Sequence, residues 1–270
     1  MTAKAEKLFD LGGRVALITG GEGYLGSVMS STLAANGARV IVWGQSQPQA
    51  DELIAKVRAD GGEIGFNMVD LTDETARQKA VAEFLASEPR LDILVNCAGR
   101  GGGGGIEKAT AEKFRLIYEL NTVAPFALFK GLLPLLREAG KRNPGGAAVV
   151  NIGSMFGAVS PDPRFYTAET SVNPPYYGAS KAALIQLTRY QAWEFGPERI
   201  RVNSLSFGPF PNPMVQQKAP EFCGNLAAGT ALRRIGSNED VAGIILYLVS
   251  DAAAYMTGEN IMLDGGWTAR

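Results

Sequence analysis

A glycine-rich turn lies between a short apolar run and a helical pattern near the start of the chain, and it constrains the fold more than any other feature. Residues 14–19 (RVALIT) are typical of a strand buried on both faces. The helical pattern after the turn continues to Asn36 and ends at Gly37, and residues 39–43 form a second apolar run. A strand, a glycine turn, a helix and a strand within about 30 residues are the context in which a dinucleotide-binding turn occurs.

The spacing of the glycines supports this interpretation. Gly21, Gly23 and Gly26 fit the pattern G-x-G-x-x-G, in which glycines allow a tight turn and a close approach to a pyrophosphate. The helix that follows would offer free N–H groups and the positive end of its dipole to the phosphates. We therefore expect this turn to bind a dinucleotide cofactor through Gly20, Gly21, Gly23, Tyr24, Leu25 and Gly26.

The rest of the chain continues the alternation of apolar runs and helical patterns. Strands that alternate with helices imply a parallel sheet that is covered on both faces. We predict one α/β domain over residues 1–270, a Rossmann fold whose doubly wound parallel sheet has about seven strands with helices on both faces. The further predicted strands are residues 64–69, 91–95, 147–152, 200–206 and 260–263, and the predicted helices are 50–60, 72–87, 110–137, 176–195 and 237–249.

Composition argues against several classes of function. The net charge is −1 and the charges are scattered, so no basic patch suggests a nucleic-acid or membrane partner. No run approaches the roughly 18 apolar residues of a membrane span, and residues 1–10 carry no apolar secretory core. Two cysteines, Cys97 and Cys223, make no disulfide framework. We expect a cytoplasmic protein that acts on a small molecule.

The chain contains no histidine, which limits its possible chemistry. Catalytic triads and dyads that need histidine are excluded, as is any histidine-ligated metal, and we expect no metal site. Tyr177 and Lys181 stand four residues apart in the predicted helix 176–195, so they share one face. The ammonium would favour the phenolate and lower the tyrosine pKa from about 10 toward working pH. These two residues are the best available proton-transfer pair.

The predicted architecture brings this pair to the expected cleft. Ligands of such sheets bind beyond the carboxyl ends of the strands. The helix that carries Tyr177 and Lys181 follows the strand that ends near Ser154. The residues that directly follow strands are therefore the candidates for chemistry, namely 20–26, 44–46, Asp70, 96–99, Ser154 and 207–212.

Together, these motifs resemble the short-chain dehydrogenase/reductase family in its compact, one-domain form. Each piece is common by itself, but their order and context together are specific, and they span nearly the whole chain. The matching pieces are Thr19-Gly20 through Gly26, Asp70, Asn96-Cys97-Ala98-Gly99, Asn121, Asn151-Ile152-Gly153-Ser154, Tyr177 to Lys181, Arg201-Val202-Asn203 and Leu263-Asp264-Gly265-Gly266.

The resemblance implies catalytic roles for four residues. Tyr177 would be the general acid in carbonyl reduction and the base in alcohol oxidation, while Lys181 would bind the nicotinamide ribose and hold the Tyr177 pKa down. Ser154 would hydrogen-bond to the substrate oxygen, and Asn121 would hold a water that links Lys181 to solvent. A homotetramer built through the long helices is also implied, with a homodimer as the alternative. The remaining implied cofactor contacts are Gln45, Ser46, Asp70, Leu71, Asn96, Ala98, Gly99, Gly208, Phe210 and Asn212.

The choice between NAD and NADP is a point where the chain departs from the family pattern. Tyr24 stands where the compact family usually has a glycine, and Gly23 comes one residue early. This spacing resembles that of the extended relatives that act on nucleotide sugars. At the end of the second strand, Gly44 replaces the acid that would bind the ribose 2′-hydroxyl of NAD, and no arginine follows to pair with the 2′-phosphate of NADP. Glu22 would repel a 2′-phosphate if it faces that way, whereas Gly44 leaves room for one. The cofactor is NAD or NADP, and the balance favours NAD.

A long loop between Ser154 and Tyr177 bears on the substrate. It contains several prolines, and Asp162, Arg164 and Asn173 offer polar contacts, which favours a hydroxyl-rich or acidic substrate. The alternative is a surface loop or a subunit contact. We therefore expect an NAD(P)-dependent oxidoreductase that interconverts a secondary alcohol and a ketone, acting on a sugar acid, sugar or polyol as gluconate-type dehydrogenases do.

Two other functions remain open at this point. An apolar cleft around Phe156, Phe207 and Phe210 would favour a 3-oxoacyl-type ketone reductase on the same scaffold. A dinucleotide-binding sensor or scaffold without turnover is the other alternative, and the intact set of proton-transfer residues argues against it.

Overall fold

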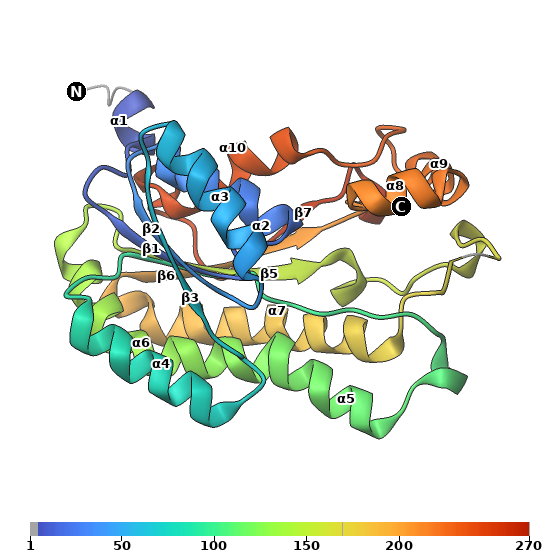
Figure 1. Cartoon of the computed structure of the whole chain (residues 1–270), viewed down its shortest axis with the longest axis horizontal. Helices are drawn as coiled ribbons and strands as arrows, with labels where there is room; N and C mark the ends of the chain where they lie inside the picture. The colour runs from blue at the N-terminus through green and yellow to red at the C-terminus, as the bar shows by residue number, and fades with distance from the viewer. Residues whose placement is uncertain (1–4, 169, 270) are drawn as a thin grey trace.

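The central layer of the structure is one parallel β-sheet (Figure 1). The computed structural model describes residues 5–168 and 170–269, so the expectation for the N-terminal residues 1–10 lies partly outside the described part. The strand order is β3-β2-β1-β4-β5-β6-β7, and every neighbouring pair is parallel, as predicted. The strands are β1 (Val15–Thr19), β2 (Arg39–Gly44), β3 (Glu63–Met68), β4 (Ile93–Asn96), β5 (Ala147–Ser154), β6 (Ile200–Phe207) and β7 (Asn260–Leu263).

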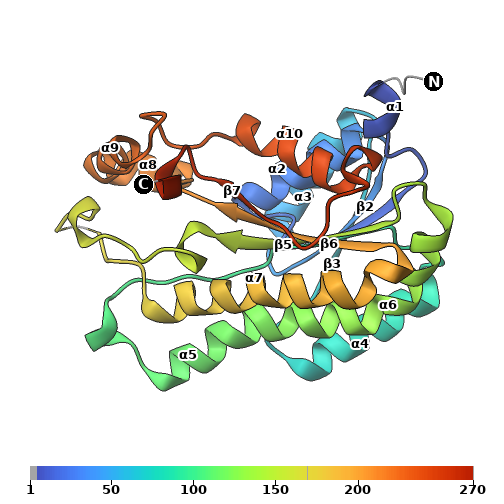
Figure 2. The ribbon, with the colours of Figure 1, turned by 180° about the vertical axis from the view of Figure 1, so that it is seen from behind.

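Helices cover both faces of this sheet, and the view from behind shows the same two layers (Figure 2). One face carries α2 (Tyr24–Ala35), α3 (Gln47–Ala59) and α10 (Asn238–Val249). The other face carries α4 (Glu74–Ser87), α5 (Ala111–Tyr118), α6 (Ala124–Arg142) and α7 (Pro175–Phe195). The smaller helical segments are α1 (Ala5–Phe9), α8 (Pro213–Lys218), α9 (Pro220–Gly229), the π-helix η2 (Glu119–Val123), and the 3₁₀ turns η1 (Ile106–Lys108), η3 (Met155–Gly157), η4 (Pro163–Phe165), η5 (Gly196–Glu198), η6 (Asp251–Ala253) and η7 (Trp267–Ala269).

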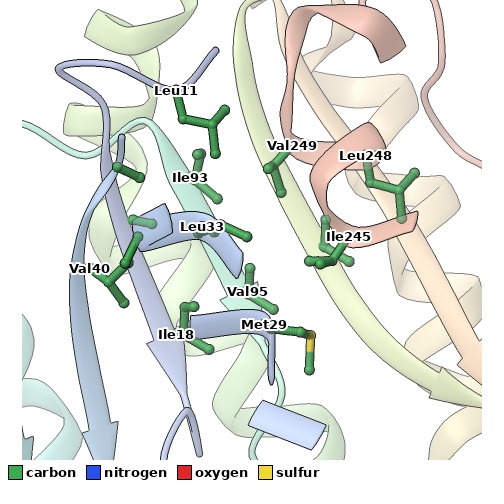
Figure 3. Packing of buried hydrophobic residues seen from close by; sticks show 14 of the residues in the cluster. Leu11, Ile18, Met29, Leu33, Val40, Ile93, Val95, Ile245, Leu248 and Val249 are labelled. Atoms are coloured by element: carbon green, nitrogen blue, oxygen red, sulfur yellow. The ribbon is translucent and has the colours of Figure 1, made fainter. Parts of the chain in front are cut away.

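Each face of the sheet has its own apolar core. On the α2 and α10 side, Ile18, Met29 and Leu33 pack with Ile245 (Figure 3). On the opposite side, Leu17 and other strand residues pack against helix α6. Because both faces are covered, every residue of β1, β5 and β6 is buried. This explains the apolar sequence of β1, and the buried polar residues Arg201 and Asn203 of β6 are hydrogen-bonded to backbone carbonyls. Burying one large aliphatic side chain stabilises the fold by roughly 1.5–3 kcal/mol.

A buried carboxylate, Asp92, ties together the end of the sheet away from the ligand-binding edge. It accepts hydrogen bonds from the Val15 amide at 2.9 Å, from Nδ2 of Asn143 at 2.9 Å and from the guanidinium groups of Arg90 and Arg142 at 2.5 and 3.0 Å. Burial acts to raise the pKa of Asp92, but these hydrogen bonds outweigh it and the pKa lies below its ordinary value. The network therefore fixes β1 and β4 to the end of α6.

The predicted elements are present, with two informative differences. The capping box at Ser237 and Asp240 forms, and β7 has the predicted bounds. The predicted helix 110–137 is interrupted by the π-helix η2, and α8 and α9 were not predicted. Prolines at the first turns of α8 and α9 allow these short helices where the residue pattern gave no periodic signal.

The helical stretch Ala111–Arg142 is the one helix among the described residues that is long and apolar enough to cross a membrane by length and composition. A core helix passes the same test. Here Leu128, Leu132 and Leu136 are almost completely buried against the sheet. The stretch therefore serves as a covering layer of the sheet.

Candidate functional site

A cleft of about 710 Å³ opens at the carboxyl ends of β1, β5 and β6, within the size range of small-molecule sites. The sheet register places Ser154 beside Phe207 and Thr19 beside Asn96, so the loops after these strands meet there. The predicted site residues that line the cleft are Gly20, Gly23, Tyr24, Leu25, Gly26, Ala98, Gly99, Ser154, Tyr177, Lys181, Gly208, Phe210 and Asn212.

The glycine turn forms one end of the cleft at the N-terminus of α2. A Cβ at Gly26 would overlap the Gly20 carbonyl oxygen and lie 2.9 Å from the Cα of Gly21, so only glycine fits there. The N-cap of the helix is Gly23, and no side chain caps the first amides. These amides are free to face an anion, as the fingerprint predicted.

Tyr177 and Ser154 meet on the other wall of the cleft. Ser154 ends β5 and Tyr177 lies in the first turns of α7, and their hydroxyl groups are hydrogen-bonded. Ser154 Oγ also accepts a hydrogen bond from the Phe156 amide at 3.2 Å, which orients it. Burial raises the pKa of Tyr177, and the Ser154 hydrogen bond lowers it only in part. The expected net lowering of this pKa by the lysine is therefore not observed.

Lys181 lies one helical turn after Tyr177 and is almost completely buried. Its Nζ donates to the Ile152 carbonyl at 2.6 Å and lies 5.8 Å from the centre of the Tyr177 ring. Burial lowers the pKa of Lys181 from 10.5 to about 8. The ammonium is thus held at a fixed position below the phenol, within reach of any group that enters the cleft beside Gly99.

Asn121 lies in the π-helix η2, which explains why the predicted long helix is interrupted at this residue. Such single-turn bulges in α-helices occur frequently at functional sites. The Asn121 side chain is bonded to the Arg100 backbone through both of its polar atoms, at 3.0 and 3.1 Å, and to Ser180 Oγ at 3.0 Å. Its Oδ1 and the Nζ of Lys181 both lie beside Gly99, so Asn121 is close to the lysine although it does not line the cleft.

A smaller pocket next to the cleft suits the adenine end of a dinucleotide. Gln45 and Leu71 line it, together with Gly20, Ala98 and Gly99 of the main cleft. Asp70 lies at its edge, where its pKa is lowered, chiefly by a 2.7 Å hydrogen bond from the Thr72 hydroxyl. Four predicted cofactor residues line neither cavity, namely Gly21, Ser46, Asp70 and Asn96.

Asn96 has a structural position instead. It is buried, and its Nδ2 donates to Asn151 Oδ1 at 2.8 Å. Asn151 in turn donates to Thr188 Oγ1 of α7 at 2.9 Å. The chain of side chains therefore crosses from β4 through β5 to the helix that carries Tyr177. Asn96 shapes the cleft from within the sheet rather than by direct contact.

The substrate side of the cleft is mainly apolar. Phe156, Phe222 and Leu226 line it beyond Ser154 and Tyr177, with Met155 and Val215 nearby. Sequence analysis missed the residues from α8 and α9, because no periodic pattern marked these short helices. Of the three polar loop residues considered earlier, Asn173 lines the cleft, whereas Asp162 and Arg164 form an ion pair outside it at 2.6 Å.

The long loop is anchored by aromatic contacts. Phe165 packs on Trp267 with ring centres 4.6 Å apart, and Tyr166 packs on Phe222 of α9 at 5.3 Å. The loop therefore forms a fixed wall over the substrate side. Cys97 lines the cleft as well, but burial raises the pKa of its thiol to about 12, so it is not a thiolate nucleophile.

Taken as a whole, the donor set fits a dinucleotide. The glycine turn allows close backbone approach, the first amides of α2 have no side-chain cap, and a separate pocket lies beyond the end of β2. No group of three or more metal-ligand side chains occurs in residues 5–168 and 170–269.

Comparisons with known proteins agree with this geometry. A family model described as Enoyl-(Acyl carrier protein) reductase matches residues 24–268. The chain is 34% identical to the rhamnolipids biosynthesis 3-oxoacyl-[acyl-carrier-protein] reductase of Pseudomonas aeruginosa, over 96% of this chain and 98% of that protein. It is 31% identical to the 2,5-dichloro-2,5-cyclohexadiene-1,4-diol dehydrogenase LinX of Sphingobium indicum (96% and 97%) and 31% identical to the cyclopentanol dehydrogenase of Comamonas sp. (95% and 97%).

Solved structures share the fold over almost the whole chain. The Pseudomonas aeruginosa RhlG/NADP active-site complex superposes with a TM-score of 0.85 at 34% identity, covering 97% of this chain and 98% of that one. A putative gluconate dehydrogenase from Agrobacterium tumefaciens has a TM-score of 0.85 at 27% identity, covering 97% and 99%. The predicted doubly wound Rossmann fold is thus confirmed, and this chain belongs to the short-chain dehydrogenase/reductase family of NAD(P)-dependent oxidoreductases that act on CH–OH groups.

Proposed function

We propose that the substrate is a small, largely apolar secondary alcohol of the alicyclic kind, or the corresponding ketone, that carries a second hydrogen-bonding group. The observation that carries this proposal is the wall beyond Ser154 and Tyr177, which is built from Phe156, Phe222 and Leu226. Asn173 adds one amide to this wall, and its Oδ1 is buried without a hydrogen-bond partner among the described residues. A buried unpaired carbonyl is costly, and a substrate hydroxyl would satisfy it.

In this proposal Tyr177 exchanges the proton of the reacting oxygen. In reduction its hydroxyl donates to the ketone oxygen, and in oxidation its phenolate accepts the proton of the alcohol. Ser154, already hydrogen-bonded to Tyr177, would donate to the same substrate oxygen and stabilise the charge that develops on it. The bound nicotinamide cofactor supplies or accepts the hydride.

Lys181 and Asn121 support this step. The Lys181 ammonium would hold the nicotinamide ribose and favour the phenolate of Tyr177 electrostatically. Asn121 lies close to Lys181 at the π-helix, which supports its predicted role in passing protons from solvent toward the lysine. We further propose that residues 1–270 act as one catalytic unit, since the elements that carry these four side chains, β5, α7 and η2, pack together.

The composition of the cleft ranks the substrate classes. Lys181 is the only cation among its described lining residues, and the family roles assign it to the cofactor, so a sugar-acid carboxylate would lack a partner. The apolar wall supports the ketone-reductase alternative better than the sugar-acid expectation. Two of the relatives are named for cyclic alcohols, and one is named for 3-oxoacyl carriers. The aromatic contacts of the loop close the wall, which favours a compact ring over a long acyl chain.

A substrate screen tests this proposal directly. Absorbance of the reduced cofactor would be followed as cyclopentanol, cyclohexanol, cyclohexanediols and gluconate are oxidised with NAD or NADP. A 3-oxoacyl thioester would be reduced in parallel with NADH or NADPH. We expect the highest kcat/KM for a cyclic alcohol or diol. Higher kcat/KM for gluconate or for the acyl thioester would contradict the proposed class, and tight cofactor binding without any turnover would support the sensor alternative.

Asn173 gives a sharper test of the second polar group. Asn173→Leu should raise KM for a cyclohexanediol by about tenfold, which corresponds to one lost hydrogen bond of about 1.4 kcal/mol. Cyclohexanol, which lacks the second hydroxyl, should be turned over as well or better and serves as the control substrate. Equal losses for both alcohols would show that Asn173 acts only through the shape of the loop.

Cofactor preference, location and assembly are also proposals. We propose a preference for NAD, although two related structures contain NADP. We also propose a cytoplasmic location, which two unpaired cysteines support.

A homotetramer is supported by exposed apolar side chains on helices α5, α6 and α7, among them Phe126, Tyr190 and Trp193, which is 89% exposed. Light scattering should give four times the 28.6 kDa chain mass, and Trp193→Glu should reduce it; a monomeric wild type would contradict the assembly.

A further inference from the structure

The Glu22 side chain reaches from the glycine turn to the end of the neighbouring strand β2. Its Oε1 accepts hydrogen bonds from the backbone N–H of Gln45 at 2.8 Å and of Ser46 at 3.3 Å. These two amides belong to the loop that follows β2. In sheets of this kind, residues of this loop contact the adenosine ribose and distinguish NAD from NADP. A carboxylate is therefore present at this loop, although the loop itself contributes none.

The Glu22 carboxylate occupies the space beside Gly44 that a side chain at position 44 would fill. A Cβ built on Gly44 would overlap both oxygens of Glu22, so the carboxylate fills the space that a residue at position 44 would enter. An acid at position 44 would have presented its carboxylate to the ribose 2′-hydroxyl. Glu22 supplies the same functional group at nearly the same place, from a different element of the fold.

Glu22 also lies at the junction of the two cofactor cavities. It lines both the main cleft and the pocket at the end of β2, two cavities that share Gly20, Ala98 and Gly99. Its Oε2 is buried and has no hydrogen-bond partner among the described residues. Buried acceptors are nearly always paired, so this carboxylate is short of one donor.

We propose that Glu22 selects NAD over NADP by accepting a hydrogen bond from the adenosine ribose 2′-hydroxyl and by repelling a 2′-phosphate. This inference rests on the cofactor use of the family and goes beyond it, because it names the residue and element that make the choice in this chain. The ribose hydroxyl would provide the donor that the carboxylate lacks. A phosphate ester at that oxygen would have no proton to donate and would bring like charges together.

Arg100 carries a positive charge that would favour NADP and so oppose the effect of Glu22. It lines the pocket at the end of β2 and is exposed, so it could pair with a 2′-phosphate. Arg100 helps to lower the pKa of Asp70, whereas Glu22 contacts the loop after Gly44 itself. Gly23, the neighbour of Glu22 in the turn, carries no side chain that could attract a phosphate. The position of Glu22 thus favours discrimination against NADP.

Binding measurements without substrate test the proposal. Dissociation constants for NADH, NADPH, 5′-AMP and 2′,5′-ADP would be measured by titration calorimetry. We expect the wild type to bind NADH at least about tenfold more tightly than NADPH, and Glu22→Gln to reduce this ratio by about 10- to 100-fold. Glutamine keeps an oxygen for the Gln45 and Ser46 amides, so the loop should be retained. Glu239→Gln is the control, because Glu239 is an exposed acid at the edge of the same region that does not contact Gly44.

Moving the carboxylate provides a second, positive test. Gly44→Asp alone should weaken NADH binding, because the new side chain would clash with Glu22. The double variant Glu22→Ser with Gly44→Asp should restore the NADH preference by placing the acid at the end of β2. Restoration would show that the carboxylate acts through its position and not through the stability of the turn.

The outcomes separate this inference from the proposed substrate. Equal wild-type affinity for NADH and NADPH, or an unchanged ratio in Glu22→Gln, would overturn the role of Glu22 and leave the alcohol substrate unaffected. A ratio that changes in Arg100→Gln but not in Glu22→Gln would transfer the choice to Arg100 and would also overturn it. Failure of both dinucleotides to bind would refute both proposals.

Discussion

Replacing Tyr177 with phenylalanine removes one oxygen and tests the assignment of the proton donor. The ring is retained, so the wall of the cleft keeps its shape. Loss of general acid–base catalysis should lower kcat by about 10²–10⁴-fold, or roughly 3–5 kcal/mol in the barrier. The lost hydrogen bond with Ser154 contributes only about 1 kcal/mol to folding, which lowers Tm by about 2 °C in a chain of this size. Activity should thus be lost while the fold is retained.

Tyr176→Phe is a matched control for this experiment. Tyr176 is the preceding residue, it is buried, and its ring packs edge-on against Phe114 at 5.7 Å, so it contributes to packing and not to the proposed chemistry. Turnover would be assayed with the best alcohol from the screen, alongside calorimetric cofactor affinity and thermal melting. We expect Tyr176→Phe to stay within about threefold of wild-type kcat. If Tyr177→Phe keeps more than a tenth of the wild-type activity, or if both variants lose activity equally, the assignment of Tyr177 as the acid/base is refuted.

Three further predictions concern the turn, the titration of the site and the buried carboxylate. Gly26→Ala should weaken NADH binding at least about tenfold by calorimetry, because its Cβ would displace the Gly20 carbonyl; unchanged affinity would place the phosphates elsewhere. Alcohol oxidation should become faster as pH rises, because burial raises the pKa of Tyr177 and the phenolate is the base; Lys181→Met should move this rise to higher pH, and a flat pH–rate profile would contradict it. Asp92→Asn should destabilise the fold by about 3 kcal/mol at pH 7 in denaturant titrations. Because the folded pKa of Asp92 lies below its unfolded value of 3.8, its stabilising effect is present above that pH and lost below it, so a difference between the two proteins that persists unchanged at pH 2 would refute the argument.

The architecture and the proximity of Tyr177 to Lys181 could be predicted from the sequence because each depends on local patterns. Runs such as residues 14–19 are apolar throughout because both faces of the sheet are covered, and that signal needs no knowledge of neighbours. Tyr177 and Lys181 could be paired because helical spacing alone puts them on one face. Ser154 followed from the end of a predicted strand.

The features that escaped prediction depend on contacts between distant residues. The Glu22 carboxylate next to Gly44 joins two segments that lie 22 residues apart, and no periodic pattern encodes this contact. The pKa of Tyr177 was expected to fall because of Lys181, but burial, which depends on the complete fold, raises it. The apolar wall of the cleft beyond Ser154 and Tyr177 could not be predicted in full, because Phe222 comes from helix α9, which the sequence pattern did not reveal. Asn96 proved to be a link inside the sheet, which its position after a strand does not indicate.

The attachment of helix α7 to the sheet has a consequence for protein engineering. Lys181 is held by the Ile152 carbonyl and Thr188 by Asn151, so helix α7 takes its position from the buried strand β5. The long loop before it is held mainly by ring contacts to α9 and to Trp267. The parts proposed to carry out the chemistry and the parts proposed to recognise the substrate are therefore held by different contacts. Exchanging the loop together with α9 as one segment should change the substrate range. The positions of Tyr177, Lys181 and Ser154 should stay the same.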